Sequence, residues 1–285
     1  MAITNRYDFI MLFDVENGNP NGDPDAGNAP RMDTNSGYGY ITDVCLKRKI
    51  RNFVELAKEG ESGYNILVKP DKALNTRFAE AYDAEQLEKG KKGKKTDDVK
   101  KARDYMCRNY FDVRAFGAVM STGDNPCGIV RGPVQITFAR SLSQINIEDV
   151  TITRQARTTE DRQETGGTEM GRKSIIPYAL YRAEGYISAA LAQKVTGLSD
   201  DDVELLWDAI VNMFENDHSA ARGKMCMRKL YIFKHDSTLG NCPSHVLFDK
   251  VEVSLKEEKP PRQFADYTIH VDDAMPEGVT LIEKL

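Results

Sequence analysis

The stretch Tyr7-Asp-Phe-Ile-Met-Leu-Phe-Asp-Val15 sets the architecture of this chain, because its residues alternate as those of a β-strand do. Every second residue from Tyr7 to Val15 falls on one face, and all of these residues are apolar or aromatic. The other face carries Asp8, Ile10, Leu12 and Asp14. The next stretch, residues 16–40, is dense in Gly, Asn, Asp and Pro, which predicts a long loop. A loop of this length inside a compact domain is usually functional or disordered.

A helix is predicted directly after this loop. Thr42 can cap a helix that runs to about Lys58. Its apolar stripe consists of Leu46, Ile50, Phe53, Val54 and Ala57. All charges between Val44 and Val54 are basic, namely Lys47, Arg48, Lys49 and Arg51. A solvated polar face explains such residues, but a face without acids beside a glycine-rich loop also favours contact with phosphate groups.

The rest of the chain predicts an α+β fold. Residues 59–110 have a weak pattern and a lysine run at 89–95, which is typical of a partly helical insertion. A further helix follows Ser199 and Asp202, which resemble a capping box. Strands are predicted at residues 134–138, 229–233, 251–255 and 267–271, and residues 175–190 predict a strand that leads into a short helix. This order favours an antiparallel sheet with helices on one side, compatible with a ferredoxin-like or RRM-like core.

Composition restricts the class of protein. The chain of 285 residues is 40% hydrophobic and 29% charged, and it lacks the ~18 consecutive apolar residues of a membrane span, so we expect a soluble, cytoplasmic protein without a membrane partner. The five cysteines and four histidines show neither disulfide nor metal-ligand spacing, so we expect no cofactor and no metal.

The net charge is -5, of which residues 246–285 contribute -4 (nine acids, five bases). A total charge says little about local phosphate-binding patches, because charges are screened over about 10 Å.

The acidic loop at residues 14–33 invites a metal-dependent interpretation. Asp14, Glu16, Asp23, Asp25 and Asp33 supply oxygen ligands, but the frame of a calcium-binding EF-hand fails, with Pro24 and Pro30 at positions that need Gly and Glu. Turn chemistry explains the same residues without an ion. A metal-dependent ribonuclease that uses this loop stays open as an alternative.

Two other segments allow a nucleic-acid interpretation. The polar stretch 143–172 and the residue after it contain Arg154, Arg157, Arg162, Arg172 and Lys173 among several acids, which fits either a solvated loop or a protruding hairpin that engages nucleic acid or a neighbour. The stretch 229–233 carries Tyr231 and Phe233, as the aromatic strand of an RRM does, but without the glycines of that signature.

Six segments, in one order along nearly the whole chain, resemble the backbone subunit of the type I CRISPR surveillance complex (Cascade), most closely its type I-C form. The first are Phe13-Asp-Val-Glu-Asn-Gly-Asn-Pro-Asn-Gly-Asp23 and Gly37-Tyr-Gly-Tyr-Ile-Thr-Asp-Val-Cys-Leu-Lys-Arg-Lys-Ile-Arg51. The others are Asp112-Val-Arg-Ala-Phe-Gly117, Gly132-Pro-Val-Gln-Ile-Thr-Phe138, Thr151-Ile-Thr-Arg154 and Ile176-Pro-Tyr-Ala-Leu-Tyr-Arg182.

The resemblance implies an RRM-like palm of the RAMP superfamily, with a fingers insertion and a thumb hairpin. The palm would comprise residues 1–58, 111–148 and 176–285, the fingers 59–110, and the thumb 149–175. Copies would stack head to tail along a CRISPR RNA, leave its spacer free to pair with target DNA, and associate with the other Cascade subunits. The resemblance implies no catalytic residue. The candidate RNA-binding residues are Arg31, Lys47, Arg48, Arg51, Arg154, Arg157, Arg172 and Lys173.

Two competing functions remain. One is the metal-dependent ribonuclease that uses the acidic loop 14–33, and the other is a protein-interaction module that binds no nucleic acid. Cleavage of labelled RNA in the presence of Mg²⁺ or Mn²⁺ separates the first from the leading hypothesis, and co-purified nucleic acid separates the second.

Overall fold

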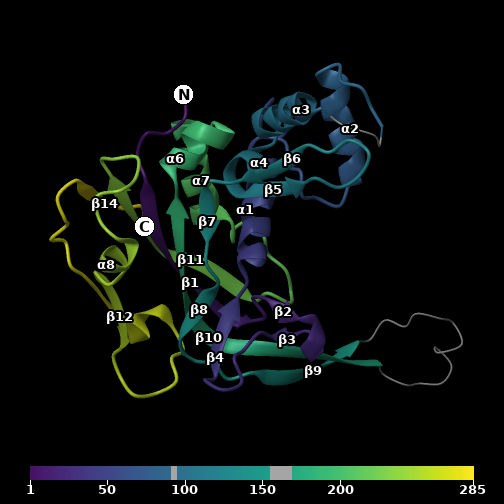
Figure 1. Cartoon of the computed structure of the whole chain (residues 1–285). Helices are drawn as coiled ribbons and strands as arrows, with labels where there is room; N and C mark the ends of the chain where they lie inside the picture. The colour runs from purple at the N-terminus through teal and green to yellow at the C-terminus, as the bar shows by residue number, and fades with distance from the viewer. Residues whose placement is uncertain (91–94, 155–168) are drawn as a thin grey trace, which may run out of the picture.

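The computed structural model describes residues 1–90, 95–154 and 169–285, and Figure 1 shows how their elements are arranged. The body is built on one large antiparallel sheet. Its strands are β1 (Tyr7–Gly18), β4 (Tyr38–Ile41), β7 (Val134–Ile136), β8 (Ala139–Gln144), β9 (Glu148–Arg154), β10 (Glu169–Ile187), β11 (Lys224–His235) and β14 (Val279–Glu283). The strand order is β14-β11-β1-β10-β8-β4, and β7 and β9 also pair with β10. The predicted α+β class with an antiparallel sheet is therefore confirmed.

The central strand β1 is buried on both of its faces. Phe9, Met11 and Phe13 belong to the main core, which lies under helices α1 (Asp43–Ala57) and α7 (Asp200–Asn212). Ile10 and Leu12 belong to a second core on the opposite face. That face is covered by α8 (Ser244–Phe248), β12 (Val251–Leu255) and β13 (Tyr267–Val271). Figure 1 shows α1 and α7 on one side of the sheet and α8 and β12 on the other.

This second cover corrects two expectations. The helices were expected on one side of the sheet, but the C-terminal segment, including α8, packs on the other side as well. Tyr231 and Phe233 lie in that second core with exposed fractions of 2% and 0%. Neither ring is available to stack on a base, so the aromatic strand of the RRM comparison is a core strand here.

Local capping signals place both main helices where the sequence predicts them. The Thr42 hydroxyl accepts a hydrogen bond from the Cys45 amide at 3.3 Å and begins α1. Ser199 and Asp202 form a reciprocal capping box at the start of α7. The apolar face of α7, which includes Val203, Leu206 and Trp207, is buried.

A smaller unit with its own core follows α1. Its elements are α2 (Leu74–Ala84), α3 (Thr96–Asn109), α4 (Phe111–Phe116), β5 (Gly117–Met120) and β6 (Gly128–Arg131). Arg114 joins this unit to the main body, because its guanidinium donates to both carboxylate oxygens of Asp202 at 2.9 and 2.7 Å. The same side chain donates to the carbonyl oxygens of Gly63 and Cys107. The quoted segment 112–117 is therefore a structural joint.

The segment 16–40 is more ordered than the predicted long loop. Strand β1 continues to Gly18, and β2 (Gly22–Asp23) and β3 (Ala29–Pro30) then form a small hairpin around the turn η1 (Pro24–Ala26). The short elements α6 (Ala189–Leu191) and η2 (Ala192–Thr196) contribute Ala189 and Ala192 to the main core, and Phe264 of η3 (Phe264–Asp266) packs against the second core. Strand β9 pairs with residues 169–175 of β10 to form an arm that extends from the body in Figure 1. None of the helices in the described ranges combines the length and apolar character that a membrane crossing needs.

Candidate nucleic-acid interface

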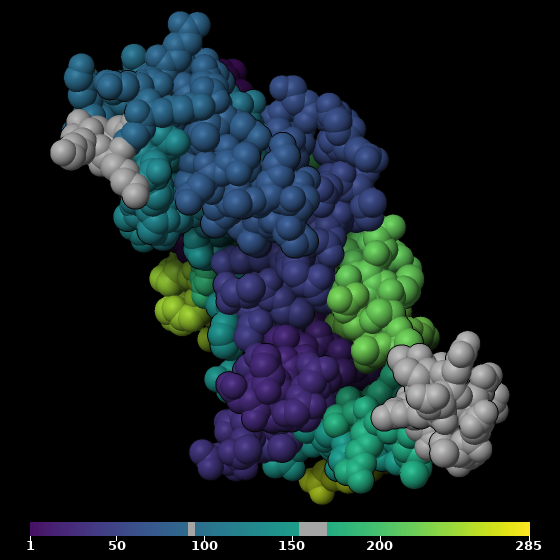
Figure 2. Space-filling view, turned by 90° about the vertical axis from the view of Figure 1, so that its right-hand side faces the viewer, coloured from purple at the N-terminus to yellow at the C-terminus, as the bar shows by residue number. Residues whose placement is uncertain are grey.

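Four segments meet on one face of the molecule, which Figure 2 views directly. They are residues 19–33, helix α1, residues 214–224 and residues 169–175 of the arm, and together we call them the convergent face. The Asn19 amide donates to the Ala221 carbonyl at 2.8 Å, and the Lys173 ammonium donates to the Ala220 carbonyl at 2.9 Å. The Thr42 amide donates to the Asn21 side chain at 3.0 Å. The loop 214–224 thus connects the arm to the glycine-rich segment.

Two glycines allow this loop to lie against the end of β1. A Cβ on Gly18 would come within 1.9 Å of the Arg222 carbonyl oxygen. Gly223 has a φ of +63°, and a Cβ there would lie 2.4 Å from the carbonyl oxygens of Glu16 and Asn17. Only residues without a side chain permit so close an approach.

A buried ion pair fastens the same loop to α1. Lys49 is fully buried and donates a hydrogen bond to the Asp217 carboxylate. Arg222 binds the other oxygen of Asp217 at 2.7 Å. Burial lowers the pKa of Lys49, and its hydrogen bond to Asp217 opposes that change. Lys49 therefore positions the loop and does not reach the surface.

The basic cluster predicted on α1 divides into internal and external members. Lys47 binds Asp43 at 2.8 Å, and Arg51 binds the buried Asp112 at 2.8 Å. Both cations also lie over the ring of Phe116. Arg48 is exposed and has no ion pair among the described residues. Of the candidates on this helix, Arg48 is the one presented freely to solvent.

The remaining candidates lie on either side of α1. Arg31 is 3.5 Å from Asp23, and its buried Nε has no hydrogen-bond partner among the described residues. Arg172 is exposed on the arm beside the half-buried Lys173. Arg154 ends β9, and Arg157 lies outside the described residues.

Arg222 and Lys224 belong to this face although the sequence analysis did not single them out. Lys224 is exposed and stands 3.5 Å from Glu16 across the β1–β11 pair. The run Arg222-Gly-Lys224 is the signal that could have found them, because a glycine between two bases marks a turn that presents cations.

The acids of loop 14–33 are engaged separately. Asp14 is buried and accepts hydrogen bonds from Tyr178 at 2.9 Å and Arg228 at 2.8 Å, and burial raises its pKa. Asp33 accepts from the Ser36 hydroxyl at 2.7 Å, which lowers its pKa. Asp23 accepts from the Asp25 amide in the turn η1. Within the described ranges, no group of three or more His, Cys, Asp or Glu side chains is placed to hold a metal ion.

The amino-acid sequence matches a family of CRISPR-associated proteins. Residues 5–272 match the family model described as CRISPR-associated protein Cas7. The chain belongs to the Cas7 family.

Known relatives extend the comparison. A CRISPR-associated protein Cas7 of Haloferax volcanii is 28% identical over 241 residues, which is 74% of this chain and 66% of that protein. The chain thus spans just under two thirds of that relative's length.

Three solved structures are also similar. A chain of a pre-nicking CRISPR RNA-guided surveillance complex gives a TM-score of 0.49 at 15% identity, and the match covers 80% of this chain and 78% of that one. A chain of a second CRISPR RNA-guided surveillance complex gives a TM-score of 0.46 at 13% identity, and the match covers 80% of this chain and 68% of that one. A chain of a type III-B Cmr-beta complex bound to cognate target RNA gives 0.44 at 12% identity, with 80% and 61% covered. Because all three TM-scores lie below 0.5, the family assignment rests on the sequence match.

Proposed function

We propose that this Cas7-family protein is a non-catalytic backbone subunit that binds CRISPR RNA along the convergent face. The observation that carries this proposal is the meeting of four segments, far apart in sequence, on one face that presents Arg48, Arg172 and Lys224 to solvent. A polynucleotide responds to such a local patch, because charges beyond about 10 Å are screened. The overall charge of -5 is therefore compatible with RNA binding.

The mode of binding follows from what a guide requires. A subunit that serves any spacer holds phosphate and sugar and leaves base identity to pairing with target DNA. The exposed groups of the convergent face include the cations Arg48, Arg172 and Lys224, which bind phosphate without reading sequence, beside the exposed acids Asp25 and Glu215. Arg31 borders the same face, where its guanidinium lies 3.5 Å from Asp23.

The finer assignment is to the type I-C Cascade complex in the cytoplasm, with copies stacked head to tail and with other Cascade subunits as partners. Support comes from the six quoted segments and from topology. The order β11-β1-β10-β8, with α1 after β1 and α7 after β10, is compatible with the βαββαβ arrangement of a ferredoxin-like or RRM-like palm. In this proposal the arm belongs to the thumb at 149–175, and helices α2 and α3 belong to the fingers at 59–110. Residues 1–58, 111–148 and 176–285 form the palm. A head-to-tail contact that does not close produces an open filament.

The test compares two triple variants with the same change of charge. Replacing Arg48, Arg172 and Lys224 by Ala should weaken binding of single-stranded RNA equally for unrelated sequences. It should also reduce the slope of log affinity against log salt by about 2, at ~0.7 per phosphate contact. The control replaces Lys72, Arg108 and Lys284, which are ion-paired to Glu80, Glu85 and Glu204 away from the convergent face. Equal affinities and slopes for the two triple variants would contradict the assigned surface.

A cleavage assay tests the alternative function, a metal-dependent ribonuclease. RNA incubated with the protein and Mg²⁺ or Mn²⁺ should remain intact. Cleavage that disappears in Asp23→Asn or Asp25→Asn would replace the present proposal with a metal-dependent nuclease.

A further inference from the structure

A stacked pair of aromatic rings stands on the sheet face opposite α1, near the β4 edge. Ile41 and Ala139 point into the core beneath α1, so their neighbours Tyr40 and Arg140 point to the other face. The rings of Tyr40 and Phe138 are parallel within 5° at a centroid distance of 6.2 Å. Phe138 is 50% exposed, which is unusual for a ring already stacked on a neighbour.

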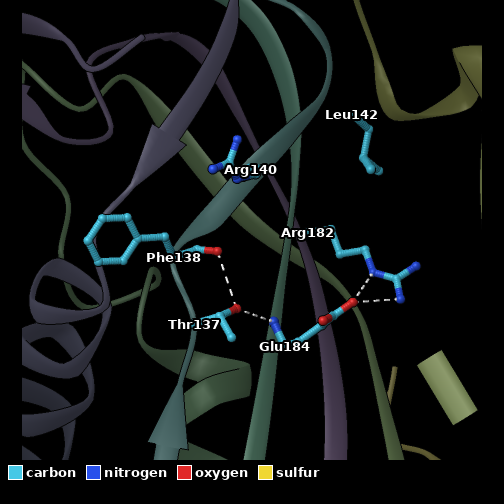
Figure 3. A pocket seen from close by; sticks show the side chains of 6 residues that line it. All are labelled: Thr137, Phe138, Arg140, Leu142, Arg182 and Glu184. Carbon is cyan, nitrogen blue, oxygen red and sulfur yellow. Dashed lines mark hydrogen bonds and ion pairs between the residues drawn. The ribbon is translucent and has the colours of Figure 1, made fainter. Parts of the chain in front are cut away.

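A pocket of about 340 Å³ opens beside this pair. Its lining consists of Thr137, Phe138, Arg140, Leu142, Arg182 and Glu184, and Figure 3 shows that Phe138 and Arg182 come from opposite sides. Arg182 is held rigidly, because it donates to the carbonyl oxygens of Val251 and Phe248 and to Glu184. The pocket therefore has one fixed polar wall and one aromatic wall.

Arg140 provides an unpaired positive charge at this site. Its side chain is exposed and has no hydrogen bond or ion pair within the described part of the chain. The acids near it are already engaged: Glu184 binds Arg182, and Asp33 accepts hydrogen bonds from Ser36 and Asn35. An incoming anion would meet an unpaired guanidinium beside the two aromatic rings of Tyr40 and Phe138.

We propose that this site binds an unpaired nucleotide of a single-stranded nucleic acid. The base stacks on the Phe138–Tyr40 pair and the phosphate lies at Arg140. Stacking on aromatic side chains tolerates any base, since every base offers a π-face, and a neighbouring Arg adds phosphate attraction. An acidic peptide could use Arg140 but would leave the exposed ring of Phe138 without a planar partner.

The site is adjacent to the convergent face across one edge of the sheet. The Tyr40 amide donates to the Arg31 carbonyl at 3.0 Å, and the Asp33 amide donates to the Tyr38 carbonyl at 2.9 Å. The segment that carries Arg31 therefore forms the border between the two surfaces. A strand that passes Arg31 can turn this edge and place one base on the ring pair. This inference rests on the proposed function and extends it to a specific stacking contact.

The experiment uses single-stranded RNA and single-stranded DNA that carry 2-aminopurine, whose fluorescence is quenched by stacking. Binding to the full chain should quench the probe. Phe138→Leu, which removes the ring but keeps an apolar side chain, should abolish this quenching and weaken binding about tenfold with little change in salt slope. Phe138→Tyr should retain both. Arg140→Met should lower the salt slope by about 1.

Controls separate the outcomes. Ile129→Ala removes an apolar side chain from β6 that is even more exposed than Phe138, and it should leave quenching and affinity unchanged. If the 2-aminopurine probe is quenched only in RNA, the site binds the guide RNA. If it is quenched in DNA as well, the site accepts either kind of single strand. Unchanged quenching and affinity in Phe138→Leu would overturn the inference while leaving the proposed function intact. The inference would also be overturned if Phe138→Leu changed only the self-association of the protein, because the site would then be a protein interface. A wild-type protein that binds neither strand would sink the proposed function itself.

Discussion

Two adjacent residues, Arg48 and Lys49, have opposite roles on α1. A helix turns by about 100° per residue, so consecutive side chains point in different directions. Arg48 faces solvent, whereas Lys49 is fully buried against Asp217 from a loop 168 residues later in the chain. Both are bases in the same acid-free cluster, and only the distant partner distinguishes the phosphate-facing residue from the structural one.

Replacing Lys49 by Met should destabilise the protein. Removing one partner of a buried ion pair leaves the other charge uncompensated and costs about 3–5 kcal/mol, and the remaining Arg222–Asp217 pair places the expected loss at the lower end. Urea denaturation measures this change. Lys72→Met, at an exposed ion pair, should cost less than about 1 kcal/mol, and equal losses in both variants would contradict the role given to Lys49.

Asp14 should make stability depend on pH. Burial raises its pKa above the ordinary value of 3.8, so the folded state holds this proton more tightly than the unfolded state does. As pH rises from 3.8 through the raised pKa, the wild type should lose stability relative to Asp14→Asn. Urea midpoints of both proteins across this range give the difference. A difference that stays constant or grows with pH would contradict the buried, protonatable state of Asp14.

At the scale of elements, the alternation of residues and the capping residues correctly predict individual strands and helices. The alternation at residues 7–15, the Thr42 cap and the Ser199 capping box all predict elements that the structure contains. The order within 16–40 was missed, because the hairpin of β2 and β3 depends on backbone turns at Gly27 and Asn28 with positive φ. The loop 214–224 was missed because its position depends on contacts with β1 and α1 rather than on its own residues.

Gly223→Ala should cost more stability than Gly27→Ala. Both glycines have φ near +60°, so both substitutions carry about 1 kcal/mol of backbone strain. At Gly27 nothing lies within 4 Å of the new Cβ, whereas at Gly223 it overlaps two carbonyl oxygens and adds about 1–3 kcal/mol. Thermal or urea denaturation compares the two variants. Gly223→Ala should also weaken RNA binding, and equal stability of the two would contradict the close packing of this loop on β1.

Arg114→Met should loosen the unit of α2, α3, α4, β5 and β6 from the body. It removes the bidentate contact with Asp202 and the contacts with three carbonyl oxygens on the insertion, those of Gly63, Cys107 and Arg108. Hydrogen exchange should become faster at residues 63–68 and 107–114 and at the start of α7. Arg108→Met, which loses an exposed pair with Glu85, should leave this exchange unchanged. Protection that is identical in both variants would contradict Arg114 as the joint.

At the scale of the whole molecule, the candidate site is a product of topology. Residues 19–33, 43–57, 169–175 and 214–224 come together because β1 lies between β10 and β11 in the sheet, which brings the end of β1 beside the arm and the loop before β11. Composition and motif spacing identified the first two segments and the arm as candidates, but they could not show that Lys47 and Arg51 bind Asp43 and Asp112. The same topology leaves one part of the second sheet face open, where Phe138 and Arg140 stand.

The affinity of the wild-type protein for two unrelated single-stranded RNAs, measured across a series of salt concentrations, tests the central claim most directly. Sugar–phosphate recognition predicts the same affinity for both RNAs and a log–log salt slope of about -0.7 for each phosphate contact. Affinity that follows sequence, that does not fall with salt, or that is absent for both RNAs would contradict it.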